Sequence, residues 1–153
     1  MKREEILNKK CIFDTINLQI MITVQTTINA SLAHVWECFT KPEHVLHWNF
    51  ASQDWHCPRA ESNFKEQGNF NYTMAAKNEN TQFDLKGTFL QIKEEQLIVY
   101  RLEDGRKVNI SFEVEEDAVK VIESFEPEEL HSHDLQREGW QAILHNFKNY
   151  CEQ

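Results

Sequence analysis

The residues best suited to chemistry crowd into one stretch, HWNFASQDWHCP at residues 47–58. This stretch holds two histidines, an aspartate and a cysteine, which are residue types that bind metal ions or transfer protons. It also holds two tryptophans, whose large rings favour contact with a hydrophobic molecule. Three interpretations follow: a metal site, a catalytic site, or the mouth of a ligand cavity.

A metal site is the least favoured of the three. Compact zinc sites bring their ligands together at short spacings such as C-x₂₋₄-C or H-x₃₋₅-H. His44 and His47 stand at a helical spacing, but the other candidate ligands are scattered along the chain: His56, Cys57, His131 and His133. We therefore expect no metal ion and no tightly held cofactor.

Composition and charge narrow the class of protein. The chain has 153 residues, of which 41% are hydrophobic, enough for one domain with a sizeable core. Its formal net charge of −9 argues against a nucleic acid or an anionic membrane as partner. No run approaches the roughly 20 apolar residues of a membrane span, so membrane insertion is not expected.

Cysteine usage and the first residues indicate a compartment. The four cysteines are far apart and include no C-x-x-C pair: Cys11, Cys38, Cys57 and Cys151. Reduced thiols fit this spacing better than a disulfide framework does. No signal peptide is evident in the charged first residues. A cytoplasmic location is the resulting expectation.

The first elements are predicted to be a strand and two short helices. Apolar residues alternate with polar ones along residues 16–28, as in a half-buried strand: Ile16, Leu18, Ile20, Ile22, Val24 and Ile28. Residues 1–20 are interpreted as an extension, mobile or lengthening that strand, before a single domain over residues 21–153. Ser31 is the expected N-cap of one helix, and Pro42 can open a second. Residues 47–58 would follow as a loop.

Antiparallel strands are predicted from Phe70 to Phe125. Apolar positions alternate throughout this region, and Asp104-Gly105 between two such runs indicates a hairpin. Glu123 falls on the same strand face as Val121 and Phe125, so an acid interrupts an otherwise apolar face.

A long helix is predicted to end the chain. Ser132 and Asp134 are typical of a helix N-terminus. Apolar residues then recur at helical spacing: Leu135, Trp140, Ile143, Leu144, Phe147 and Cys151. The helix would run for about 18–20 residues, close to 30 Å. The element order therefore predicts the α+β class, with a curved antiparallel sheet wrapped around the last helix.

Several strings resemble a known family. HVWECFTKPEHVLHW at 34–48, GNFNYTMAAK at 68–77 and GWQAILHNFKNYCE at 139–152 are together similar to the START-like, helix-grip or SRPBCC superfamily. The resemblance is strongest to its AHSA-type branch, named for a heat-shock-chaperone ATPase activator, and covers about residues 22–152. It implies an elongated cavity between helix and sheet that holds a lipid or another hydrophobic molecule. Some members of this superfamily are cyclases or hydratases, so the resemblance also allows such an activity on a hydrophobic substrate.

Catalysis rests on few residues. Glu123 could face such a cavity with a raised pKa. It could instead lie at a local bulge, or pair with Arg101 or a lysine. Asp54 and His56 are a second candidate acid–base pair. No nucleophile motif and no phosphate-binding glycine loop is present. Non-catalytic binding is favoured over an enzyme.

Ligand binding is the favoured function. Trp48 and Trp55 lie on the predicted loop, where they could cover the cavity, with Asp54 and His56 as a polar rim. Aromatic walls with a few polar groups suit a lipophilic or aromatic ligand. The candidate ligand-binding residues are Trp48, Phe50, Asp54, Trp55, His56, Phe70, Tyr72, Met74, Phe112, Glu123, Phe125, Trp140 and Leu144.

Two expectations concern protein partners. The long first strand could pair with a second copy at the sheet edge, which would give a weak homodimer rather than a monomer. The family name raises a chaperone-interacting role in stress response as a minor alternative. The partner most expected remains a small hydrophobic molecule.

Overall fold

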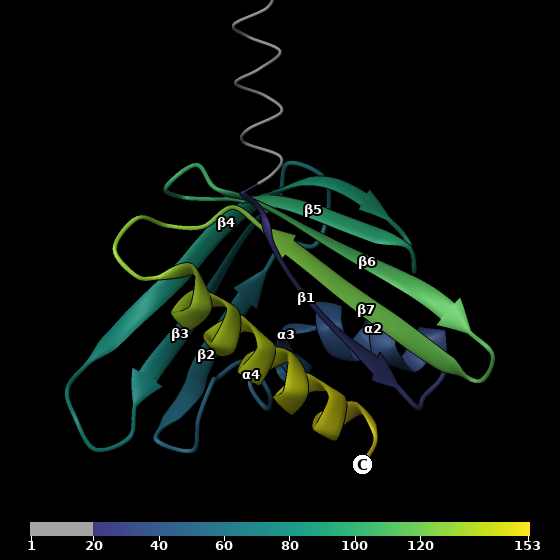
Figure 1. Cartoon of the computed structure of the whole chain (residues 1–153), viewed down its shortest axis with the longest axis horizontal. Helices are drawn as coiled ribbons and strands as arrows, with labels where there is room; N and C mark the ends of the chain where they lie inside the picture. Colours follow the sequence, from purple (N-terminus) through teal and green to yellow (C-terminus); the bar gives the residue numbers. More distant parts are fainter. Residues whose placement is uncertain (1–19) are drawn as a thin grey trace, which may run out of the picture.

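The computed structural model describes residues 20–153. A curved sheet of seven antiparallel strands, in the order β1-β7-β6-β5-β4-β3-β2, wraps around the C-terminal helix (Figure 1). In chain order the elements are β1 (Ile22–Ile28), α2 (Leu32–Thr40), α3 (Pro42–Val45), β2 (Trp55–Ser62), β3 (Asn69–Ala76), β4 (Gln82–Lys93), β5 (Leu97–Leu102), β6 (Lys107–Glu115), β7 (Ala118–Phe125) and α4 (His133–Cys151). The predicted α+β class is confirmed, and the predicted element order is confirmed except for β2, which was not predicted.

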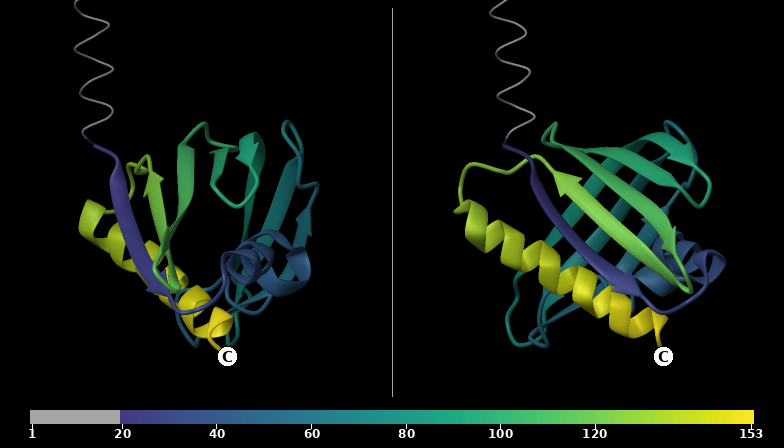
Figure 2. Two further views of the ribbon diagram at one scale, coloured as in Figure 1. Left: turned by 90° about the vertical axis from the view of Figure 1, so that its right-hand side faces the viewer. Right: turned by 45° about the vertical axis from the view of Figure 1, so that its right-hand side comes forward.

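The helices lie on the concave face of this sheet. Figure 2 shows α4 crossing the open side of the curved sheet, with α2 and α3 near one end. Ser31 and Ser132 cap α2 and α4 as predicted, since their side chains accept hydrogen bonds from the backbone N–H groups of His34 and Leu135. The core lies between the concave face and these helices.

The strand pattern follows from apolar residues at every second position. In β7, Val119, Val121, Glu123 and Phe125 are all buried, while the intervening residues are partly exposed. The hairpin between β5 and β6 turns at Gly105, whose φ of +95° favours glycine. The hairpin predicted at this position is therefore confirmed.

The first strand is shorter than the sequence pattern predicts. Strand β1 begins at Ile22, and Ile20 lies in a turn and is exposed. Residues 16–19 of the predicted strand, and most of the predicted extension, lie outside the described residues. Sheet pairing sets the boundary, because the partner strand β7 pairs only as far as Phe125 opposite Ile22.

Part of residues 47–58 is strand rather than the predicted loop. Strand β2 begins at Trp55 and contains Pro58, which sits within a register shift between His56 and Arg59. Strand β2 is the last strand of the sheet, where a proline and an irregular register are tolerated. The proline obscured the strand in the sequence.

The last helix also differs from its predicted pattern at its first turn. Leu135 was expected on the buried face, but it is 54% exposed, and Gln136 is buried in its place. Within residues 20–153, no helix is long and apolar enough to cross a membrane.

Candidate functional site

A cavity of about 390 Å³ lies between the concave face of the sheet and α4. Its size is within the range of small-molecule sites. Nine of its lining residues are phenylalanine, tyrosine or tryptophan: Phe39, Trp48, Phe64, Phe70, Tyr72, Phe83, Phe89, Tyr100 and Trp140. Aromatic surface is therefore the main chemical character of this cavity.

Phe70 on β3 organises one wall. Its ring contacts Tyr72, Phe89 and Tyr100, with ring centroids 4.9–5.0 Å apart. Gly87 on β4 lies beneath it, and a Cβ at that position would stand 2.6 Å from the Phe70 ring. The glycine lets the ring lie directly on the sheet, which keeps the ring out of the cavity volume.

Trp140 supplies the helix side of the wall. Its indole stacks on Phe125 of β7 with ring centroids 4.0 Å apart. Trp48, at the other side, is buried, and its Nε1–H donates a hydrogen bond of 2.9 Å to the carbonyl of Cys38. Trp48 was predicted to cover the cavity from a loop, but it is instead packed in the core against Phe39 and Phe147.

Glu123 is the acidic group inside the cavity wall. It is 7% exposed, and the sheet register places it between Val24 of β1 and Ile110 of β6. Within residues 20–153 its carboxyl makes no hydrogen bond or ion pair, so the pairing with Arg101 or a lysine left open by the sequence is not formed. Burial raises the pKa of Glu123 to about 8.

Tyr100 on β5 is the polar neighbour of this acid. Burial raises the pKa of its hydroxyl well above the ordinary value, and the charge of Glu123 raises it further. The buried acid and phenol give an otherwise apolar cavity a small polar region on the sheet side.

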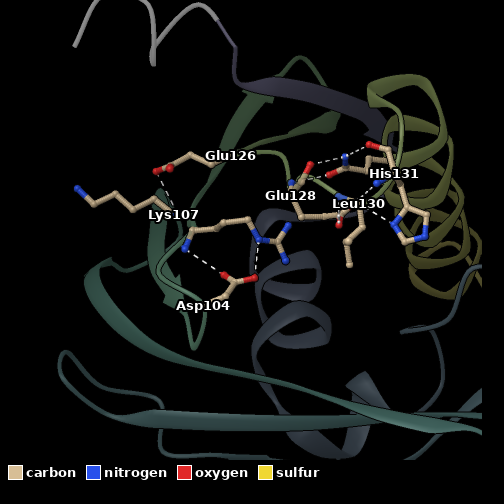
Figure 3. A network of polar contacts seen from close by, with 8 residues as sticks. Asp104, Lys107, Glu126, Glu128, Leu130 and His131 are labelled. Atoms are coloured by element: carbon tan, nitrogen blue, oxygen red, sulfur yellow. Dashed lines mark hydrogen bonds and ion pairs between the residues drawn. The ribbon is translucent and has the colours of Figure 1, made fainter. Parts of the chain in front are cut away.

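A second polar region lies at the loop between β7 and α4. Figure 3 shows Glu128 accepting hydrogen bonds from the backbone N–H groups of Leu130 and His131, both 2.9 Å long. The His131 ring bonds the same carboxylate at 2.8 Å. Gln136 donates to the carbonyls of Glu128 and His131. Because His131 is exposed yet lines the cavity, the cavity reaches solvent here.

Arg106 completes this end of the cavity. Its Nε lies 2.8 Å from Oδ2 of Asp104 in the β5–β6 turn (Figure 3). At this polar end Arg106 is thus paired with Asp104, and the His131 ring contacts Glu128.

The structure brings together some of the residues predicted from the sequence and separates others. Six line the cavity: Trp48, Phe70, Tyr72, Met74, Glu123 and Trp140. Seven do not: Phe50, Asp54, Trp55, His56, Phe112, Phe125 and Leu144. Phe112, Phe125 and Leu144 are core residues, and Trp55 instead packs on Phe83 with ring centroids 5.8 Å apart.

Several lining residues were missed in the sequence. Leu85, Phe89 and Tyr100 share the strand phase of residues that were chosen, so their alternation could have found them. Phe64 comes from an irregular segment before β3, and Arg106, Glu128 and His131 come from turns and loops, where no periodicity marks the inward side.

Other sites are less suited to a ligand. A depression of about 860 Å³ lies over polar residues of β2–β5, such as Asn71, Lys86 and Arg101, and it is wide and open. No group of three or more His, Cys, Asp or Glu side chains within residues 20–153 is placed to hold a metal ion.

A curved antiparallel sheet gripping a C-terminal helix over an aromatic cavity defines the START-like, or helix-grip, class of α+β proteins. Within that class, residues 29–152 match the family model described as Activator of Hsp90 ATPase homolog 1-like protein. The chain belongs to this family. No curated protein matches the sequence.

Solved structures agree with this assignment. The AHSA1-like protein from Aeromonas hydrophila is 34% identical, with a TM-score of 0.82 over 86% of this chain and 92% of that one. A protein from Cytophaga hutchinsonii is 44% identical, with a TM-score of 0.75 over 86% and 91%. A Nitrosomonas europaea protein, 14% identical with a TM-score of 0.73 over 86% and 93%, shows the shared fold alone.

Proposed function

We propose that this protein binds a small lipophilic or aromatic molecule in the cavity between α4 and the sheet. The observation that carries the proposal is the volume of about 390 Å³ lined by nine aromatic side chains. Apolar walls with a few polar groups are the usual composition of a small-molecule site.

The arrangement of the wall supports binding over simple core packing. Aromatic rings that could have filled the volume are fixed against one another or against the sheet, as Trp140 is on Phe125 and Phe70 is over Gly87. An unfilled apolar volume forfeits dispersion contacts, which a bound ligand would restore.

Native mass spectrometry of the purified protein, followed by tryptophan-fluorescence titrations with lipids and phenolic compounds, tests the proposal. A co-purified mass, or saturable quenching at micromolar ligand, is expected. Flat titrations together with a mass equal to that of the chain alone would refute ligand binding.

Acid catalysis on a hydrophobic substrate is a second candidate function. The buried Glu123, with a pKa near 8, is protonated at neutral pH and could donate a proton to a bound substrate. Incubating an identified ligand with wild type and with Glu123→Gln, and analysing the ligand by mass spectrometry, would separate this function from binding. Conversion by wild type alone would establish an enzyme.

A further inference from the structure

Within residues 20–153, the buried carboxyl of Glu123 has no hydrogen-bond or ion-pair partner. It sits among apolar strand neighbours, Val24 and Ile110, and accepts no hydrogen bond from any described residue. A buried polar group without a partner costs free energy, and native proteins rarely leave one in this state. Because the carboxyl lines the cavity, a ligand could supply the partner.

The charges around the cavity favour a positively charged ligand group. The other titratable residues that line it are Tyr72 of β3, Tyr100 of β5, Arg106, Glu128 and His131. The lining residues from α2 and α4 are Phe39, Thr40, Gln136, Trp140 and Ile143, which carry no charge, and none comes from β1. Arg106 contacts Asp104 and the His131 ring contacts Glu128, so acids already compete with an anionic ligand group for both of these donors.

Aromatic side chains line the same cavity as Glu123. Phe125 is two residues from Glu123 on the same face of β7, a separation of about 7 Å along the strand. The Trp140 indole covers Phe125 from the helix side, with planes 12° from parallel. Glu123 and Trp140 both line the cavity, so an ammonium group paired with the carboxylate would lie in a volume with aromatic walls, whose π-faces attract cations.

We propose that the ligand of this cavity is a hydrophobic amine, an apolar body carrying one protonatable nitrogen that pairs with the carboxylate of Glu123. The inference rests on the proposed function and names the chemical class of its ligand. The apolar body occupies the aromatic volume, and the nitrogen lies on the sheet side, at Glu123 of β7.

Proton release on binding makes this inference measurable. An ammonium that pairs with Glu123 requires the carboxylate, so near neutral pH the carboxyl must release its proton to solvent when the amine binds. Amine affinity should therefore rise up to tenfold per pH unit from about pH 6 to about pH 8. It should fall again only where the amine itself loses its proton, near pH 10 for a primary amine.

Three probes that share one naphthalene ring test this inference: 2-(1-naphthyl)ethylamine, 2-(1-naphthyl)ethanol and 1-naphthylacetic acid. Isothermal titration calorimetry gives their affinities across this pH range, and buffers of different ionisation enthalpy report the protons released. At about pH 8 we expect the amine to bind at least about tenfold tighter than the alcohol and the acid to bind weakest. Glu128 also lines the cavity and would attract the amine but not the alcohol, so the contribution of Glu123 is separated by substitution.

Glu123→Gln keeps the shape of the side chain and removes its charge. In this variant the amine and the alcohol should bind within about threefold of each other, and the rise of amine affinity with pH should vanish. Glu113→Gln makes the same exchange at an exposed position of β6 and is the matched control. If Glu123→Gln folds poorly, the relative affinities of the three probes for the wild-type protein still test the amine assignment.

The outcomes are distinct. Equal affinities of amine and alcohol, or tightest binding by the acid, would overturn the amine assignment and leave the binding function standing. Binding by none of the three probes would contradict both the function and its ligand class.

Discussion

Trp140 of α4 lies face to face on Phe125 of β7, with ring centroids 4.0 Å apart and planes 12° from parallel. Phe125 is fully buried, whereas the indole is half-buried and also lines the cavity. One contact therefore joins the helix to the sheet and shapes the binding volume. Stability and ligand affinity should be coupled at this residue.

Trp140→Ala should weaken both properties. Removing the indole deletes a stacking partner of Phe125 and one wall of the cavity, so we expect a loss of about 3 kcal/mol in the free energy of unfolding. Ligand affinity should fall by more than tenfold, measured on protein that urea unfolding shows to be folded. Trp55→Ala is the control, because that indole does not line the cavity and only backs the lining residue Phe83. Equal effects of the two variants on affinity would contradict the assigned wall.

Glu123 should make stability depend on pH. Its folded-state pKa of about 8 lies above the ordinary 4.5, so between these values the native state binds more protons than the unfolded state. The stability contributed by this group is then greatest at and below about pH 4.5 and falls as pH rises, by about 1.4 kcal/mol per pH unit between 4.5 and about 8.

Urea unfolding of wild type and Glu123→Gln at several pH values measures this dependence. The glutamine variant should gain stability relative to wild type as pH rises, with the difference levelling off above about pH 8. Glu113→Gln should follow wild type, since that side chain is exposed. Parallel curves for wild type and Glu123→Gln would show that the acid is not buried in solution.

Gly87→Ala should disturb the cavity wall. The new Cβ would stand 2.6 Å from the Phe70 ring and 2.8 Å from the carbonyl oxygen of Arg101, so the ring must move into the cavity. Overpacking of this kind costs about 1–3 kcal/mol. Both thermal stability and ligand affinity should decrease. A variant with unchanged affinity would place the ligand away from Phe70.

Gly139→Ala, in contrast, should stabilise the protein. Gly139 lies inside α4, and a Cβ there would meet nothing within 4 Å, so the helix makes no close approach to the sheet at this residue. Alanine should therefore stabilise the protein by about 0.5–1 kcal/mol through helix propensity. Calorimetric melting measures the change, and a lower melting temperature would disprove the open space around Gly139.

The sequence predicted most of the fold because apolar periodicity was clear where packing is regular. The alternation of Val119, Val121 and Phe125 predicted β7, and Ser132 predicted the start of α4. Strand β2 was missed because an edge strand can hold Pro58 and a register shift without losing its pairing to β3.

The site was harder to predict than the fold. Glu123 was identifiable because an acid in an apolar phase is conspicuous, and it does line the cavity. Trp55 and His56 were chosen for their chemistry alone, but the cavity lining does not include them. Periodicity reports which face of a strand is inward; it does not report where along that face a volume stays unfilled.

The most direct test of the binding cavity uses the four tryptophans as internal probes. Trp48 and Trp140 line the cavity, whereas Trp36 and Trp55 do not. In a ¹H–¹⁵N NMR titration with 2-(1-naphthyl)ethanol, the indole Nε1–H resonances of Trp48 and Trp140 should shift saturably. Those of Trp36 and Trp55, whose only ring contacts with the lining are to Phe64 and Phe83, should shift less. Four unmoved resonances, or shifts confined to Trp36 and Trp55, would contradict a ligand site between α4 and the sheet.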